Sequence, residues 1–82
     1  MGYYFEDEAW EDYNNLEKRD KKKLDKMLKE IRRGNRVSHG EALKHELSGY
    51  YSAEINEKDR LIYKLENNTV HVYSCKGHYG DK

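Results

Sequence analysis

The 82-residue chain contains no proline, only one cysteine, and no hydrophobic run long enough for a membrane span or a signal peptide. One cysteine excludes an intramolecular disulfide, and the missing apolar run argues against a membrane protein. We therefore expect a cytoplasmic protein. A chain of this length buries one core and hides only roughly 60–65% of its unfolded surface. The sequence thus predicts a single domain over residues 1–82, whose stability a partner or second copy would increase.

The chain also has no net charge, because its 16 Lys and Arg residues balance its 16 Asp and Glu residues. The charges are nevertheless segregated. Between Lys18 and His45 there are eleven basic residues and four acidic ones, a local charge of +7. A segregated basic surface is typical of a polyanion-binding site. A solvated helix face explains such a run about as often, so both interpretations stay open at this point.

Two helices are expected in the first half of the chain. The first begins at Glu6 and has one apolar stripe: Ala9, Trp10, Tyr13 and Leu16. The second follows Asp20, the expected N-cap, and ends before Gly34, which suits a left-handed C′ position. Its apolar stripe comprises Leu24, Met27, Leu28 and Ile31. Its basic face comprises Lys22, Lys26, Lys29 and Arg33.

Strands are expected before and after these helices. Residues 2–5 form a short first strand, and residues 36–40 form a loop. Three strand-like runs follow the loop: Tyr50–Ile55, Arg60–Glu66 and Thr69–Cys75. Asn67 and Asn68 join the last two runs as a tight hairpin, since asparagine tolerates positive φ. The order β-α-α-β-β-β predicts an α+β fold, with two helices packed on a small antiparallel twisted sheet.

The sequence offers little for metal or cofactor chemistry. His71, Cys75 and His78 are the only soft ligands that cluster, and they lack the close pairs and the fourth ligand of a zinc site. Cys75 lies in an apolar strand, where a lone cysteine is usually a small buried hydrophobe. There is no Gly-rich phosphate loop and no dinucleotide fingerprint. We expect neither a metal nor a cofactor.

A metal-free set of side chains remains. RNA supplies its own nucleophile, the 2′-hydroxyl, so a protein that cleaves it needs a base, an acid and cations that stabilise the phosphate. Glutamate suits the base, histidine the acid near neutral pH, and arginine the bidentate phosphate contact. The candidates are Glu41, Lys44, Arg60, His78 and Tyr79.

Each candidate also has a structural interpretation. Glu41 is also explained as an ordinary carboxylate in a loop. Arg60 is also explained as a charge at a strand edge, which discourages aggregation between sheets. His78 and Tyr79 suit a frayed chain end. Composition and spacing alone thus indicate a small α+β domain with a basic face, for which RNA binding is one open interpretation.

The segment EALKHELSGYYSAEINEKDRLIY, followed by SCKGHY, resembles the Txe/YoeB family of bacterial toxins in the RelE superfamily. The family pattern runs E-x-L-K-x-x-L-x-G, aromatic-Ser-Arg-x-Ile, R-L-[IV]-Y and C-[KR]-x-H-Y. A looser similarity extends back through both helices, so it covers nearly the whole chain. The resemblance implies the toxin of a type II toxin–antitoxin system, a ribosome-dependent endoribonuclease that cleaves mRNA in the ribosomal A site.

The resemblance also implies roles for individual residues. Glu41 would be the general base and His78 the general acid, and Arg60 would stabilise the phosphate charge. Tyr79 would position or stack on the RNA, with Lys44 as a supporting phosphate contact. The basic helix face would meet ribosomal RNA of the 70S ribosome. The expected protein partners are a Phd/YefM-like antitoxin and a second copy of the chain.

The chain departs from the family pattern after Ser52. Ala53 stands at the family's arginine position, where the resemblance implies a substrate contact. If that arginine holds the phosphate, its loss lowers the rate by roughly 10²–10³. A natural and an engineered substitution both explain it. Two other functions stay open beside an attenuated nuclease: a non-catalytic module that binds the antitoxin as a co-repressor, and a plain RNA-binding module.

Overall fold

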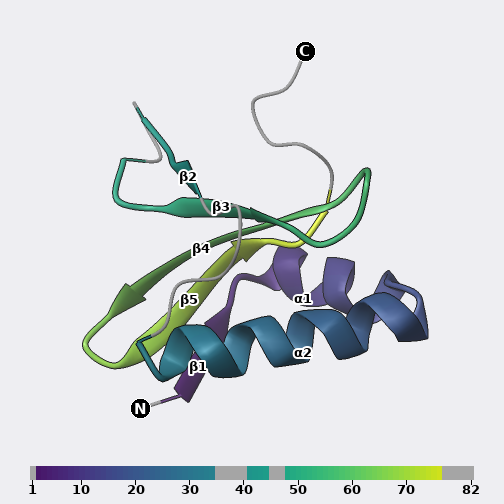
Figure 1. Cartoon of the computed structure of the whole chain (residues 1–82), viewed down its shortest axis with the longest axis horizontal. Helices are drawn as coiled ribbons and strands as arrows, with labels where there is room; N and C mark the ends of the chain where they lie inside the picture. Colours follow the sequence, from purple (N-terminus) through teal and green to yellow (C-terminus); the bar gives the residue numbers. More distant parts are fainter. Residues whose placement is uncertain (1, 35–40, 45–47, 77–82) are drawn as a thin grey trace.

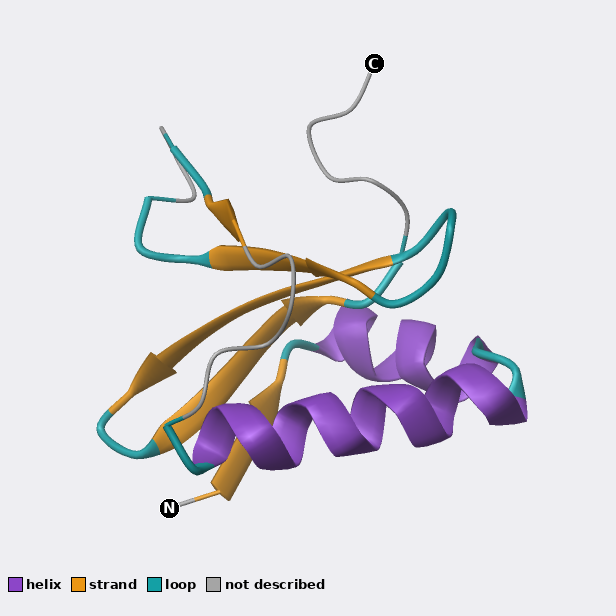
Figure 2. Cartoon of the chain, in the orientation of Figure 1, coloured by secondary structure: helices purple, strands orange, loops and turns teal. Residues whose placement is uncertain are grey.

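The computed structural model describes residues 2–34, 41–44 and 48–76 of the chain. Its elements follow in this order: β1 (Gly2–Phe5), α1 (Asp7–Asn15), α2 (Lys18–Arg32), β2 (Glu41–Ala42), β3 (Tyr51–Glu54), β4 (Arg60–Glu66) and β5 (Thr69–Ser74). Both helices lie on the same face of the sheet (Figures 1 and 2). The predicted α+β fold, with two helices packed on a small sheet, is confirmed.

The strand order is β1-β5-β4-β3-β2. Neighbouring strands are antiparallel except for β1 and β5, which run parallel. The sheet is therefore mixed rather than wholly antiparallel, and the two-residue β2 adds a strand to those predicted. Parallel neighbours need a long crossover between them. Here the chain passes through both helices and three strands between β1 and β5.

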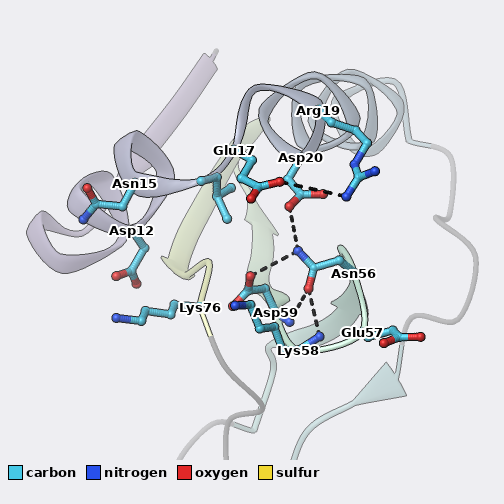
Figure 3. A pocket seen from close by; sticks show the side chains of 11 residues that line it. Asp12, Asn15, Glu17, Arg19, Asp20, Asn56, Glu57, Lys58, Asp59 and Lys76 are labelled. Atoms are coloured by element: carbon cyan, nitrogen blue, oxygen red, sulfur yellow. Dashed lines mark hydrogen bonds and ion pairs between the residues drawn. The ribbon is translucent and has the colours of Figure 1, made fainter.

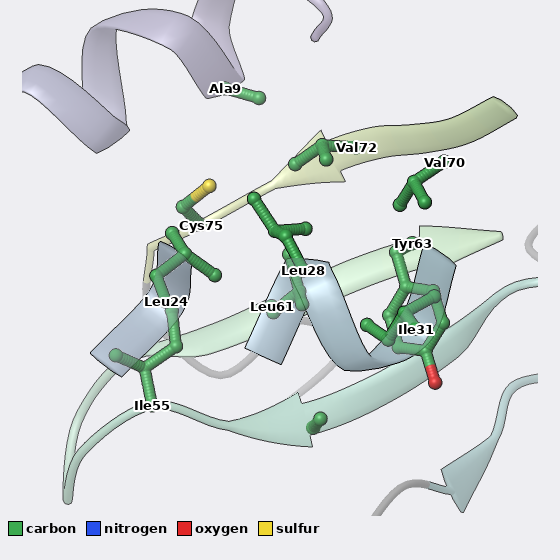
Figure 4. Close-up of a cluster of buried hydrophobic side chains, with 11 residues drawn as sticks. Ala9, Leu24, Leu28, Ile31, Ile55, Leu61, Tyr63, Val70, Val72 and Cys75 are labelled. Carbon is green, nitrogen blue, oxygen red and sulfur yellow. The ribbon is translucent and has the colours of Figure 1, made fainter. Parts of the chain in front are cut away.

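The hydrophobic core lies between the two helices and the face of the sheet that they cover (Figure 4). Both the amphipathic helices and the alternating strands contribute to it. Its buried members are Ala9, Leu24, Leu28, Ile31, Ala53, Ile55, Leu61, Tyr63, Val70, Val72 and Cys75. The predicted stripe of the second helix is confirmed, with Met27 at its margin. Trp10 is not part of the core, because 52% of its surface is exposed.

The predicted N-cap of α2 is wrong, because the helix begins at Lys18 rather than after Asp20. Asp20 instead lies in the first turn and is buried. Its carboxylate accepts a hydrogen bond of 2.9 Å from the Asn56 side-chain amide. A carboxylate is also favoured there by the positive end of the helix dipole. Asp20 thus ties the start of α2 to the β3–β4 turn.

Two predicted turns are confirmed. Gly34 has φ +91°, and its N–H donates to the Ile31 carbonyl at 2.9 Å, as expected of a residue just after a helix. Asn67 and Asn68 have φ angles of 53° and 64°. Positive φ at both central residues is the requirement of a type I′ hairpin, which fixes the register of β4 against β5.

Candidate active site

We call the face of the sheet opposite the helices the open face. It carries the charged side chains of β4 that could contact a substrate. Leu61 and Tyr63 of β4 pack into the core. Because side chains alternate along a strand, Arg60 and Lys64 lie on the open face. Ile62 also lies there and is buried at its centre, with Ser52 and Ser74 as its strand partners.

Arg60 is the first residue of β4 and is held in place by Ser52 of β3. Its Nε donates to the Ser52 hydroxyl at 2.5 Å, and its Nη2 approaches the Ser52 carbonyl oxygen at 3.4 Å. Within the described ranges, no Asp or Glu forms an ion pair with Arg60. The guanidinium is therefore oriented by a neutral residue. Its remaining N–H donors suit a bidentate contact to phosphate.

Glu41 lies on the other side of β3 from Arg60. It is in β2 and pairs with Ser52 of β3. Ser52 thus has Glu41 as its partner on one neighbouring strand and anchors the Arg60 side chain on the other. Lys44 follows β2 closely and is exposed. The fold therefore brings two of the predicted catalytic residues to either side of one serine, although 19 positions separate them in sequence.

The other predicted site residues do not all join this group. The basic residues Lys22, Lys26 and Lys29 of α2 and Arg33, its C-cap residue, are exposed, as predicted. They belong to the helical layer, so the sheet separates them from the open face (Figure 1). His78 and Tyr79 lie outside the described residues.

The expected substrate contact at position 53 is wrong for Ala53. It pairs with Leu61, has no exposed surface, and belongs to the core on the helix-covered face. A side chain in that position has no surface that a substrate can touch. The residue at position 53 therefore stabilises the core of this chain. Ser52 and Glu54, on either side of it, point to the open face because side chains alternate along the strand.

Two of the three soft ligands named from the sequence, His71 and Cys75, lie on opposite faces of the sheet, and the third, His78, lies outside the described residues. His71 lies on the open face, where its Nε2 is 2.8 Å from a carboxylate oxygen of Glu6. Cys75 lies in the core, and burial raises the pKa of its thiol to about 12. A thiol that stays protonated is a poor nucleophile. Among the described residues, no three His, Cys, Asp or Glu side chains are grouped to hold a metal.

An aromatic cluster surrounds His71 on the open face and was not among the predicted site residues. The His71 ring contacts Tyr4 and Tyr50 edge-on, with centroids 4.9 and 5.9 Å apart. Tyr50 also contacts Tyr73 and lies beneath the Lys64 ammonium, which is 5.0 Å from its ring centroid. The alternation of His71 and Tyr73 against Val70 and Val72 placed two of these rings on one face. The contribution of Tyr4 depends on the parallel pairing of β1.

A cavity of about 580 Å³ lies where the junction of the helices meets the β3–β4 turn (Figure 3). Asn56 connects the two sides, since its amide nitrogen donates to Asp20 at 2.9 Å and to Asp59 at 3.1 Å. Its amide oxygen accepts the backbone N–H groups of Lys58 and Asp59, both at 2.8 Å. Because Arg60 follows directly, this network fixes the start of β4.

Among the described residues, no helix is both long and apolar enough to cross a bilayer.

The fold is that of solved bacterial toxins. It matches the YoeB–YefM complex from Staphylococcus aureus with a TM-score of 0.83 and 37% identity, covering 94% of this chain and 95% of that one. It matches the YoeB dimer from the same organism with a TM-score of 0.84 and 36% identity, covering 96% and 98%.

Residues 5–79 match the model of the family described as the YoeB-like toxin of bacterial type II toxin–antitoxin systems, and the chain belongs to this family. Among curated relatives, Toxin YoeB of Escherichia coli K12 is 34% identical over 84 residues, which cover 96% of this chain and 100% of that toxin. Toxin YoeB of Synechocystis is 35% identical over 84 residues, covering 96% and 98%. The resemblance inferred from the motifs is confirmed.

Proposed function

We propose that this toxin is a ribosome-dependent endoribonuclease that cleaves mRNA in the ribosomal A site without a metal. The observation that supports this most is the arrangement around Ser52. Arg60 is oriented by that serine with no described acidic partner, and Glu41 is the strand partner of the same serine. The Arg60 guanidinium and the backbone position of Glu41 thus lie on either side of one serine in the sheet, and a site carried by rigid strands is well preorganised.

The proposed reaction is an in-line transfer at phosphorus. Glu41 takes the proton of the 2′-hydroxyl, and the 2′-oxygen forms a bond to the adjacent phosphorus. The bond from phosphorus to the 5′-oxygen breaks, and His78 gives that oxygen a proton. The products are a 2′,3′-cyclic phosphate and a free 5′-hydroxyl. Arg60 stabilises the extra charge on the phosphate, Lys44 supports it, and Tyr79 positions the RNA.

The basic face of α2 is the proposed contact with ribosomal RNA. Lys22, Lys26, Lys29 and Arg33 are exposed on the helical layer, away from the open face. This separation allows one side of the molecule to hold ribosomal phosphates while the other meets the mRNA. Binding that neutralises phosphates releases counterions, so we expect affinity for the 70S ribosome to fall steeply with salt.

The proposed protein partners are a Phd/YefM-like antitoxin and a second copy of the toxin, in the cytoplasm. Relatives at 37% and 36% identity were solved as a YoeB–YefM complex and as a YoeB dimer. A disordered antitoxin segment that folds on the toxin surface would block the open face and stabilise an 82-residue chain with a small core.

Primer extension on an mRNA under translation in a reconstituted system tests this function. We expect A-site cuts from the wild type, and cleavage lowered by roughly 10²–10⁴ in Glu41→Ala and in His78→Ala, the usual size of one acid–base role. Glu11→Ala, which changes an exposed carboxylate on α1, is the matched control and should cleave normally. Unchanged cleavage in both folded variants would contradict the assignment. Silence from the wild type would favour an antitoxin-binding module.

A further inference from the structure

We propose that Glu54 is an electrostatic brake on this site, because its carboxylate repels the scissile phosphate that Arg60 would hold. The inference rests on the proposed function above and names a residue that regulates it. Glu54 is the last residue of β3 and the direct strand partner of Arg60, the first residue of β4. It is also exposed, so its charge is accessible from the open face.

The register places the two charges beside each other. Directly opposed residues of antiparallel strands have Cβ atoms about 4.5–5.5 Å apart and share a face. Glu54 and Arg60 nevertheless form no ion pair, because the guanidinium is turned along β3 toward Ser52. Glu54 therefore lies beside Arg60 on the same face of the sheet without forming an ion pair with it. A phosphate held by Arg60 would lie well within a Debye length of about 8 Å from this negative charge.

The same register explains why the brake is at position 54 and not at position 53. Ala53 faces the core, so the missing family arginine leaves no gap on the open face. Glu54 faces the site and adds a negative charge where the reaction accumulates another. Reduced activity of this toxin would thus come from a charge that is present at position 54.

Glu54 also has a plainer interpretation. β2 pairs only with Tyr51 and Ser52, so the end of β3 has no partner on that side among the described strands. A charged residue at an unpaired strand edge discourages aggregation. That role makes no prediction about phosphate, whereas the brake predicts a change in phosphate affinity that salt abolishes.

The first test needs no ribosome. Inorganic phosphate is titrated into ¹⁵N-labelled protein, and the Arg60 Nε–H signal is followed by NMR at low salt. We expect Glu54→Gln to tighten phosphate binding about 2–5-fold, the size of one exposed charge pair, and the gain to disappear at high salt. Glu11→Gln carries the same change of net charge on α1 and should bind as the wild type does.

The second test is A-site cleavage by the same variants at subsaturating toxin. A rate raised about 2–5-fold in Glu54→Gln, together with tighter phosphate binding, supports the brake. Tighter phosphate binding with no cleavage by any variant keeps the brake on Arg60 and overturns the proposed nuclease. Phosphate affinity that does not differ between wild type and Glu54→Gln, or phosphate that perturbs Arg60 in neither, overturns the brake even if both proteins cleave RNA.

Discussion

The helix-covered face and the open face of the sheet use the same strands in different ways. On the covered face, Leu61, Val70 and Val72 have no exposed surface and pack against two amphipathic helices. On the open face, polar side chains are held by one another, as Arg60 is by Ser52 and His71 by Glu6. One face derives its stability from burial, and the other positions charged groups at the surface.

The difference between the two faces is clearest at two neighbouring residues of β3. Ala53 and Glu54 are adjacent in β3, yet one is in the core and the other beside Arg60. Because the side-chain period of a strand is two residues, a shift of one position exchanges a structural role for a functional one. Substitutions at these two positions should therefore differ in the property that they change.

The largest effect is expected when an arginine is placed at position 53. Ala53→Arg puts a long charged side chain into a filled core, where an uncompensated charge costs roughly 3–5 kcal/mol of the free energy of unfolding. Glu54→Arg makes the same side chain on the open face and should change stability by no more than about 0.5 kcal/mol. Urea unfolding followed by circular dichroism measures both.

The opposite order would contradict the assignment of the two faces. If Ala53→Arg is as stable as the wild type and cleaves mRNA faster, position 53 supplies a phosphate contact after all. A loss of stability in Glu54→Arg would instead mean that β3 is rotated relative to the core.

The next effect is catalytic. Arg60→Ala removes the oriented cation of the open face, and we expect A-site cleavage to fall by roughly 10²–10³, as when other stabilisers of transition-state charge are lost. Lys64→Ala is the matched control, because Lys64 lies on the same strand and face but contacts Glu66 at 3.2 Å. Equal losses in the two variants would show that the open face acts only through its overall charge.

The smallest effect concerns the buried thiol on the covered face. Burial raises the pKa of Cys75 from 9.0 to about 12, so the folded protein holds a proton that the unfolded chain releases near pH 9. Its contribution to stability is complete below pH 9 and is lost as the pH rises toward 12, by about 1.4 kcal/mol per pH unit. Cys75→Ala should flatten the fall in unfolding free energy between about pH 8.5 and 10.

Tyr13 is a second group with a raised pKa, and its titration contributes mainly above this pH range. Burial and a hydrogen bond to Asp25 raise the pKa of Tyr13 from 10.0 to about 12, so its own effect on stability falls mainly between pH 10 and 12. The same pH slope in the wild type and in Cys75→Ala would show that the thiol is not held protonated by the core.

The elements were predictable because local signals specify them. Gly34 and the Asn67–Asn68 hairpin carry backbone requirements that few other residues satisfy, and the apolar spacing of α2 matches a helical period. The parallel pairing of β1 with β5 and the two-residue β2 were not predictable. They depend on contacts between segments distant in sequence, for which no local pattern exists.

The site was predictable in part. The motifs contain both Arg60 and Ser52 but give no role to the serine, because Ser52 orients Arg60 through the register of β3 against β4. The placement of Ala53 was available in the alternation of Tyr51 and Ala53 against Ser52 and Glu54. A family motif compares residue types at a position and carries no information about faces, so it suggested a substrate contact where the strand places a core residue.

One measurement tests the proposed chemistry most directly. An mRNA is prepared with a single 2′-deoxynucleotide immediately 5′ of the A-site cut, and its cleavage during translation is compared with that of the all-ribose message. If Glu41 activates the 2′-hydroxyl, the cut at that position disappears while other A-site cuts remain. A cut that persists at the deoxynucleotide would mean that water is the nucleophile, and would contradict the role of Glu41 as the base that activates the 2′-hydroxyl.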